Sequence, residues 1–236
     1  MKHMLSMSGL SRTGQPGWRP FVGSAIGLAL CLMSFSAGSI AAAQDKNGGE
    51  GDAKWKSLFD GESLEKWEPT SFGGEGEVRV EDGVIVLEAG VSLTGIHWKG
   101  DIPKANYEIE LESQQLQGID FFCGLTFPVN ESHCSFIVGG WAGSVVGLSN
   151  IDGLDASQNE TTKYMKFEKE KWYRVRVRVE SDRIRCWIDD EQVVDQDIKD
   201  RKIDLRPEVI PSKPLGIAAW QTKAGLRKIR IRDLPQ

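Results

Sequence analysis

The sequence predicts an all-β protein, a two-sheet β-sandwich or jelly roll. Apolar and polar residues alternate with a period of two in many short segments, and turn residues separate these segments at short intervals. Such alternation buries one face of a strand and leaves the other in water. No segment has the period of a convincing amphipathic helix, and many short strands without helices are typical of sandwiches and jelly rolls.

The expected strands follow one another along the chain. Asp82 and Gly83 supply the positive φ that a tight hairpin needs between two short Val-rich segments. The segments that alternate most clearly are 78–80, 84–86, 107–111, 175–179, 184–188, 215–219 and 229–231. They extend over almost the whole chain beyond residue 54, so we expect a single domain there.

The first 43 residues have the features of a secretory signal peptide. Residues 1–20 include three basic residues and no acidic residue, and an apolar run follows at 21–35. Ala41 to Ala43 then fit a small-residue cleavage site. The apolar run is short for a membrane span. We therefore expect a signal peptide at 1–43, a flexible linker at 44–53 and the jelly-roll domain at 54–234. The protein is then secreted or periplasmic, without membrane insertion after cleavage.

Charge and cysteine content limit the partners. The chain has 29 Lys and Arg against 34 Asp and Glu, and the leader contains only basic ones. An acidic domain does not attract nucleic acid or an anionic membrane. Three cysteines lie beyond the leader, and alternation predicts that Cys186 is buried and inert. Cys123 and Cys134 flank one turn, where both a disulfide and free thiols are possible.

Two rows of like charge need an interpretation. Glu108, Glu110 and Glu112 alternate along one expected strand, and arginines alternate along 174–178. We interpret them as solvated outer faces of paired or nearby strands, worth roughly a few tenths of a kcal/mol per pair. The alternative is a pair of catalytic carboxylates, Glu108 and Glu110, on a concave sheet face.

The stretch 121–162 is the part of the sequence that is most informative about function. It comprises a hairpin, a Gly-rich segment and a loop rich in Asp, Asn and Ser. Alternation places Thr126, His133 and Ser135 together on the face away from the core. Functional residues concentrate on loops held by rigid scaffolds. The alternatives are an ordinary surface loop and a histidine that serves only as a structural hydrogen-bonding group.

Trp141 follows two glycines that allow close approach of a ligand to the backbone. An aromatic ring there is a stacking surface for the C–H face of a sugar, although a core or edge position is the alternative. Further on, 149–160 offers many oxygen ligands, among them Asp152 and Asp155, of the kind that a divalent cation such as calcium prefers. Turn formation explains the same composition.

Several motifs resemble the 3-keto-disaccharide hydrolase domain family, long labelled a domain of unknown function. They are WKSLFDGESLEKW (55–67), NYEIELE (106–112), KWYRVRVRVESDRIRCWIDDEQVVD (171–195) and the closing PLGIAAW and LRKIRIRDL. The likeness covers about 54–234. It implies a concanavalin-like jelly roll, secreted or periplasmic, that acts on oxidised glycosides. It also pairs the opening and closing motifs, so we expect Leu58 and Ile231 to lie close together.

The resemblance also implies a chemistry. A ketone acidifies the C–H between it and the anomeric carbon, so a base can remove that proton and the aglycone leaves by elimination, before water adds. His133 is the first candidate base because its pKa lies nearest neutrality, with Asp120, Asp152 and Asp155 to orient it or hold a cation. The candidates for binding the sugar are Trp141, Trp220, Gln221, Asn159 and Thr126.

Two other functions stay open at this stage. Jelly rolls host both catalysis and binding, so a non-catalytic carbohydrate-binding or adhesive module is the main alternative. The other is a scaffold that mainly contacts proteins. Stacking tryptophans with no base within reach of the ligand would favour binding alone.

Overall fold

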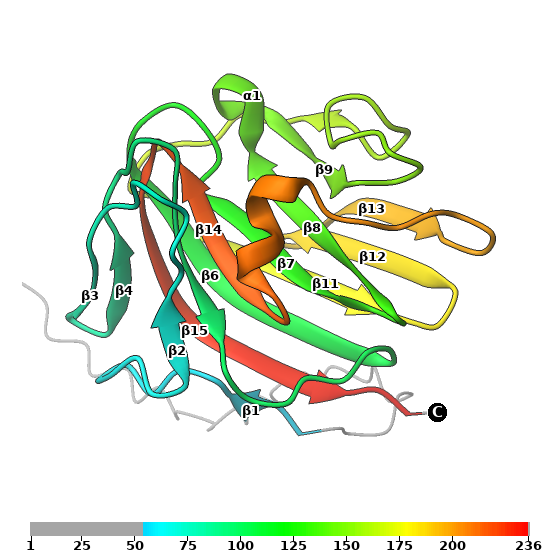
Figure 1. Cartoon of the computed structure of the whole chain (residues 1–236), viewed down its shortest axis with the longest axis horizontal. Helices are drawn as coiled ribbons and strands as arrows, with labels where there is room; N and C mark the ends of the chain where they lie inside the picture. The colour runs from blue at the N-terminus through cyan, green and yellow to red at the C-terminus, as the bar shows by residue number, and fades with distance from the viewer. Residues whose placement is uncertain (1–53, 236) are drawn as a thin grey trace, which may run out of the picture. The chain divides into compact units, whose positions relative to one another are not determined.

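Two antiparallel β-sheets pack face to face in the computed structural model, which describes residues 54–235 (Figure 1). The predicted all-β, two-sheet sandwich is therefore confirmed. The expected signal peptide and linker, at 1–43 and 44–53, lie outside the described residues. Within 54–235, no helix has the length and apolar character needed to cross a membrane.

The first sheet contains the charged segments of the sequence. Its order is β13 (Glu191–Asp197), β12 (Arg183–Ile188), β11 (Tyr173–Val179), β6 (Tyr107–Gln117), β15 (Lys223–Asp233), β4 (Val84–Leu87) and β3 (Val78–Glu81), with β1 (Lys56–Ser57) beside β15. The Leu58 amide donates to the Ile229 carbonyl at 2.8 Å, and Lys56 lies opposite Ile231. The two ends of the domain are therefore close together, as expected.

The second sheet forms the other layer. Its order is β10 (Lys163–Tyr164), β9 (Val145–Ser149), β8 (Ser132–Gly139), β7 (Cys123–Val129), β14 (Gly216–Trp220), β5 (Leu93–Trp98) and β2 (Trp67–Pro69). Two short helical segments, α1 (Gly140–Gly143) and η1 (Pro207–Ser212), complete the described elements. Figure 1 shows η1 in front of β7 and β14. All of β7 is buried, although strands with one wet face normally alternate, and the ring of Phe121 lies over Gly124 of this strand.

The three cysteines lie in the core between the sheets, and all are free thiols. Cys123 lies opposite Val138 and Cys134 lies opposite Phe127, so the hairpin register does not pair the two cysteines. Burial raises the pKa of Cys123 and of Cys134 to about 12. Of the two possibilities left by the sequence, the structure has free, protonated thiols, and Cys186 is buried as predicted.

The glutamate row of β6 lies between arginines of β11 and β15. Glu108 pairs with Arg178 on one side and Arg232 on the other, and its side chain is 0% exposed. The charged rows do belong to neighbouring paired strands, as the sequence analysis expected. The expectation that these rows form a solvated face was wrong for Glu108 and Glu110, because both are buried. Trp55 contributes to the cover, because the guanidinium of Arg232 lies 4.7 Å from its ring centre. These glutamates are on the first sheet, away from the pocket described next.

Candidate functional site

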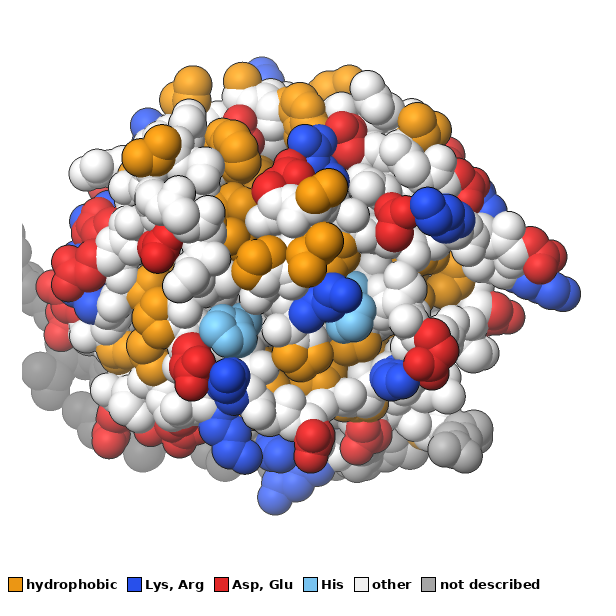
Figure 2. All heavy atoms as spheres, viewed as in Figure 1, with side chains coloured by type: hydrophobic (Ala, Val, Ile, Leu, Met, Phe, Trp, Pro, Cys, Tyr) orange, Lys and Arg blue, Asp and Glu red, His pale blue; other side chains and the backbone are white. Residues whose placement is uncertain are grey.

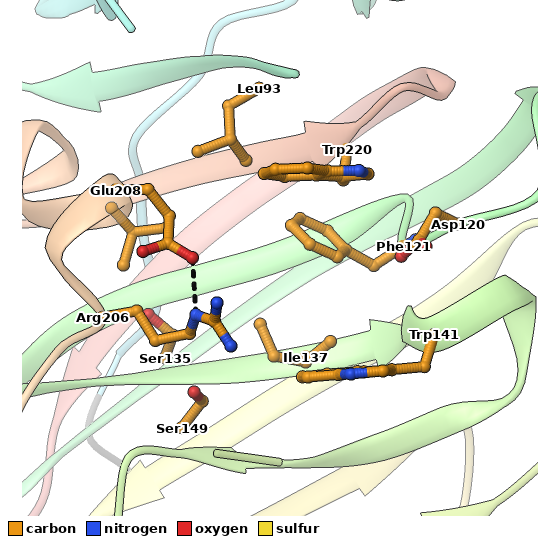
Figure 3. Close-up of a pocket in the computed structure, with 11 residues that line it drawn as sticks. Leu93, Asp120, Phe121, Ser135, Ile137, Trp141, Ser149, Arg206, Glu208 and Trp220 are labelled. Atoms are coloured by element: carbon orange, nitrogen blue, oxygen red, sulfur yellow. Dashed lines mark hydrogen bonds and ion pairs between the residues drawn. The ribbon is translucent and has the colours of Figure 1, made fainter. Parts of the chain in front are cut away.

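A pocket of about 230 Å³ opens on the outer face of the second sheet (Figure 3). Its walls come from four strands (β5, β8, β9 and β14), the loop before β7, the turn α1 and the segment η1. The lining residues are Leu93, Asp120, Phe121, Ser135, Ile137, Trp141, Ser149, Arg206, Glu208, Val209 and Trp220. The pocket is therefore mostly apolar with a few polar groups, which is the usual composition of a small-molecule site.

Small residues leave room for the aromatic wall. A side chain at Gly124 would place its Cβ 2.9 Å from the Phe121 ring, so that ring lies over the backbone of β7 only because position 124 is glycine. Trp220 is the cross-strand neighbour of Leu93 and packs in one apolar cluster with Phe121. The apolar part of the pocket is thus built on the rigid strands β5, β7 and β14.

Trp141 stands on an unusual turn. Its backbone has φ 48° and ψ 67°, and Ala142 follows with φ 65° and ψ 32°. Both are left-handed conformations, which cost a residue with a Cβ roughly 1–2 kcal/mol. Gly139 and Gly143 also have positive φ and carry no such penalty. The turn projects Trp141 to the edge of the pocket, where the residue is 39% exposed.

Asp120 ties this turn to the loop before β7. One carboxylate oxygen accepts the Phe121 amide at 2.8 Å, and the other accepts the Ala142 amide at 3.3 Å. The main chain of Asp120 is itself held, because its carbonyl accepts the Gln115 side-chain amide and its amide donates to the Thr222 hydroxyl. The carboxylate is therefore fixed at the rim next to Trp141.

An arginine shared by two carboxylates occupies the opposite side of the pocket. Arg206 donates from Nε to Glu208 at 2.5 Å and from Nη1 to Asp155 at 3.0 Å. Asp155 is held in turn by the amide and hydroxyl of Ser157. Figure 3 shows the Arg206 and Glu208 pair facing Trp141 and Asp120 across the pocket. The Arg206 and Glu208 pair thus lies on one side of the pocket, and the aromatic rings lie on the other side together with the Asp120 carboxylate.

The structure brings three of the expected site residues together, namely Trp141, Trp220 and Asp120. It does not bring His133 into their pocket. His133 lies on the same face of β8 as Ser135 and is half-buried, but it lies two residues farther along the strand. Burial, followed by the positive charges of Lys213 and Lys104, lowers the pKa of His133.

The two expected cation ligands are occupied by arginines. Asp152 accepts the Lys202 amide at 2.8 Å and Arg201 Nε at 2.6 Å, and these two contacts, the amide first, lower the pKa of Asp152. Asp155 pairs with Arg206 as described above. Within residues 54–235, no group of three or more His, Cys, Asp or Glu side chains is arranged to hold a metal ion.

The other expected sugar-binding residues have structural partners outside the pocket. The Thr126 hydroxyl is buried and hydrogen-bonded to Ser135 at 2.8 Å. Asn159 is buried, and its amide donates to three main-chain carbonyls of its own loop and of β9. Gln221 donates to the Val91 carbonyl at 2.8 Å. Of the three, only Thr126 directly supports a lining residue.

Arg206 and Glu208 were missed by the sequence analysis. They lie more than forty residues beyond the stretch 121–162, in a short Arg-Pro-Glu segment that matches no catalytic motif. The only local signal was a pair of opposite charges before a proline-containing segment. Their place over the second sheet depends on how η1 crosses the strands, which the local sequence does not specify.

A concave pocket with tryptophans and paired charges on a two-sheet sandwich is typical of proteins that act on or bind carbohydrates. The comparisons agree at that level. A family model, described as the 3-keto-alpha-glucoside-1,2-lyase-like domain, matches residues 54–232. The chain belongs to this family, so the resemblance seen in the sequence is confirmed. No curated protein sequence matches the chain.

Solved structures show the same fold at low identity. A candidate glycosyl hydrolase from Parabacteroides distasonis is 16% identical, with a TM-score of 0.51 over 77% of this chain and 94% of that one. The Crh5 transglycosylase in complex with NAG is 13% identical, with a TM-score of 0.53 over 78% and 85%. The carbohydrate recognition domain of Emp46p is 12% identical, with a TM-score of 0.50 over 78% and 100%. The fold therefore occurs with both catalytic and binding descriptions.

Proposed function

We propose that this protein is an exported enzyme that cleaves 3-keto glycosides in the pocket between Trp141 and Trp220. The observation that carries the proposal is the pairing of an aromatic wall with the Arg206 and Glu208 charges in one pocket. An aromatic wall suits the C–H face of a sugar ring, and a carboxylate beside a guanidinium supplies the two groups that elimination requires. Membership of the 3-keto-alpha-glucoside-1,2-lyase-like family supports the same substrate class.

The reaction places two demands on the protein. A base removes the proton on C2, between the ketone at C3 and the anomeric carbon, and the electron pair moves onto the ketone oxygen as an enolate. The enolate then expels the aglycone from C1, the leaving oxygen takes the proton that the base removed from C2, and water adds across the resulting double bond. The site must therefore hold a base near C2 and a hydrogen-bond donor near the ketone oxygen.

Glu208 is our candidate base and Arg206 our candidate donor. Glu208 uses Oε1 for Arg206, and its Oε2 makes no hydrogen bond to any residue of the described chain. Arg206 uses Nε and Nη1 for two carboxylates, and its Nη2 makes no bond within 54–235. Both free atoms belong to side chains whose orientation is already fixed, so little reorganisation precedes the reaction.

The other expected bases fit less well. Both oxygens of Asp120 already accept main-chain amides, so this carboxylate has a structural task. His133 does not line the pocket, and Asp152 is paired at the surface with Arg201. We therefore place the proton transfer at Glu208.

The test is cleavage of a 3-keto glucoside and of its unoxidised parent by the protein and its Glu208→Gln variant. We expect turnover of the oxidised sugar only, and a loss of about 10² to 10⁴ in kcat for the variant, the usual range for a general base. Glu160→Gln is the matched control, because Glu160 pairs with Arg201 outside the pocket. His133→Ala provides a second comparison and should leave kcat nearly unchanged.

Other outcomes decide against the proposal. Equal rates on oxidised and parent sugars would exclude the elimination route, and a large loss for His133→Ala alone would move the base to that residue. Binding of both sugars with turnover of neither would favour the carbohydrate-binding module. The observation that supports this second candidate is that both pocket carboxylates are already paired or hydrogen-bonded.

A further inference from the structure

Exposed apolar side chains lie on loops next to the aromatic side of the pocket. Val91 is 77% exposed, Ile119 is 71% exposed and Trp141 is 39% exposed. The other exposed large apolar residues among 54–235 are Leu154, Tyr164 and Ile210. Figure 2 shows hydrophobic side chains at several places on the viewed face, some of them at its upper edge, where Figure 1 has α1 and the nearby loops. We call Val91, Ile119 and Trp141 the apolar rim.

The rim residues lie on loops that also supply the pocket wall. Ile119 directly precedes Asp120, and its carbonyl would be 3.0 Å from a Cβ at Gly143, so it touches the turn of Trp141. Val91 lies two residues before Leu93, and its carbonyl accepts the Gln221 side chain next to Trp220. The rim is therefore continuous with the aromatic side of the pocket, opposite Arg206 and Glu208.

The exposed position of Trp141 is maintained against a conformational penalty. Two successive non-glycine residues, Trp141 and Ala142, adopt left-handed conformations, and the Asp120 carboxylate holds the Ala142 amide. Strained backbone of this kind persists only where the surroundings fix it, and it is common at ligand-binding sites. Burying the indole in the core would avoid the exposure, so the turn is built to present the ring outward.

We propose that the leaving group of the substrate is an apolar aromatic aglycone that stacks on Trp141 within the apolar rim, and that Asp120 is the positioning residue that holds this platform. The inference rests on the proposed function and adds the aglycone class to it. The keto sugar then lies toward Arg206 and Glu208, and the aglycone lies toward Trp141 and Ile119.

The chemistry of the rim decides between aglycones. A second sugar carries hydroxyl groups along its edge, which need hydrogen-bond partners when they leave water. The side chains of Val91 and Ile119 offer none, and the Trp141 ring offers a single N–H donor. An aromatic group loses little on leaving water and gains stacking and burial on the indole.

The experiment compares benzyl and methyl 3-keto glucosides, whose leaving alcohols have similar acidity, so that aglycone binding is separated from leaving-group chemistry. The readout is the ratio of kcat/KM for the two substrates. We expect the protein to prefer the benzyl glycoside roughly tenfold, in line with one aromatic stacking contact. Trp141→Ala should bring the ratio close to one. Tyr164→Ala, which removes another exposed aromatic side chain outside the pocket, should leave the ratio unchanged.

Two variants test the role of Asp120. Asp120→Ala removes both amide contacts and should reduce the ratio as Trp141→Ala does. Asp120→Asn keeps one acceptor oxygen for the turn, so it should recover much of the ratio, with kcat on the methyl glycoside reduced less than tenfold. Thermal unfolding of each variant shows whether the domain is intact. A loss of 10² or more in kcat for Asp120→Asn would instead make Asp120 the base.

Failure of this inference differs from failure of the proposed function. Cleavage of both 3-keto glycosides with equal kcat/KM would overturn the aromatic aglycone while leaving the elimination enzyme in place. Cleavage of neither would overturn the enzyme and the aglycone assignment together. A benzyl preference that survives Trp141→Ala would show that the aglycone does not stack on Trp141. The positioning role of Asp120 would then be rejected as well.

Discussion

The Glu108, Glu110 and Glu112 row allows one chemical change to be repeated at three depths. All three carboxylates lie on β6 and pair with basic residues of neighbouring strands. Their side chains are 0%, 9% and 21% exposed. We predict that replacement by Gln destabilises the domain most at Glu108, less at Glu110 and least at Glu112.

The expected loss in the free energy of unfolding depends on the basic residues that each substitution leaves without a charged partner. Glu108→Gln leaves the guanidiniums of Arg178 and Arg232 close to an uncharged amide, and breaking a buried ion pair costs about 3–5 kcal/mol. Gln retains hydrogen-bonding capacity, so we expect about 3 kcal/mol. For a domain of this size, that corresponds to a fall in Tm of roughly 6–12 °C. Glu112 pairs nearer to water with Arg227 and Lys228, where such pairs contribute about 0–1 kcal/mol.

Urea unfolding at neutral pH, followed by tryptophan fluorescence, measures the series. The free energies of unfolding should fall in the order of burial, with unchanged m-values. A loss at Glu112 as large as that at Glu108 would refute the reasoning, because burial would then not govern the strength of the pairs. So would a loss below about 1 kcal/mol at Glu108, which would mean that the two arginines find other partners.

Two further predictions concern single sites. Ala142→Gly should raise the free energy of unfolding by about 1 kcal/mol in the same urea assay, because glycine adopts the left-handed conformation without the Cβ penalty; an unchanged or lower value would mean that the turn is not strained. Burial and nearby lysines lower the pKa of His133 in the folded state. The neutral imidazole therefore contributes fully to the free energy of unfolding above pH 6.5, the pKa of the unfolded state, and this contribution is lost as pH falls through the folded-state pKa. Below pH 6.5 the protein should therefore lose stability more steeply than His133→Gln, and parallel curves would contradict this.

The strands were predictable because one side of each faces the core. Tyr107, Ile109 and Leu111 alternate with glutamates, and all three point inward at 0% exposure. The same reasoning gave no hint that Glu108 is buried, since period two separates the faces without showing what covers the outer one. Covering depends on the arginines of β11 and β15, which come from distant parts of the sequence.

The sequence identified Trp141, Trp220 and Asp120 of the site, but not the charged pair Arg206 and Glu208 on the other side of the pocket. Trp141 was found because it follows two glycines, and its pocket was expected on this face of β8. His133 was assigned to the same pocket because alternation identifies the face of a strand but not the position along it. Successive residues on one face are about 6.6 Å apart, so His133 lies one such step from Ser135 and outside the pocket.

The acidic loop after β9 illustrates how composition and role differ. Its oxygen-rich residues suggested a cation, but the Asn159 amide donates to carbonyls of the loop and of β9, and Asp152 pairs with Arg201. These are the turn and surface contacts that Asp and Asn make for backbone reasons. Asp155 is the exception, because its carboxylate reaches Arg206 and fixes Nη1. With Nε held by Glu208, the guanidinium plane is set from two sides, and Nη2 is directed by groups fixed before any substrate binds. The loop therefore contributes to the proposed chemistry through the orientation of one arginine, and a donor oriented in this way stabilises a developing enolate without reorganising.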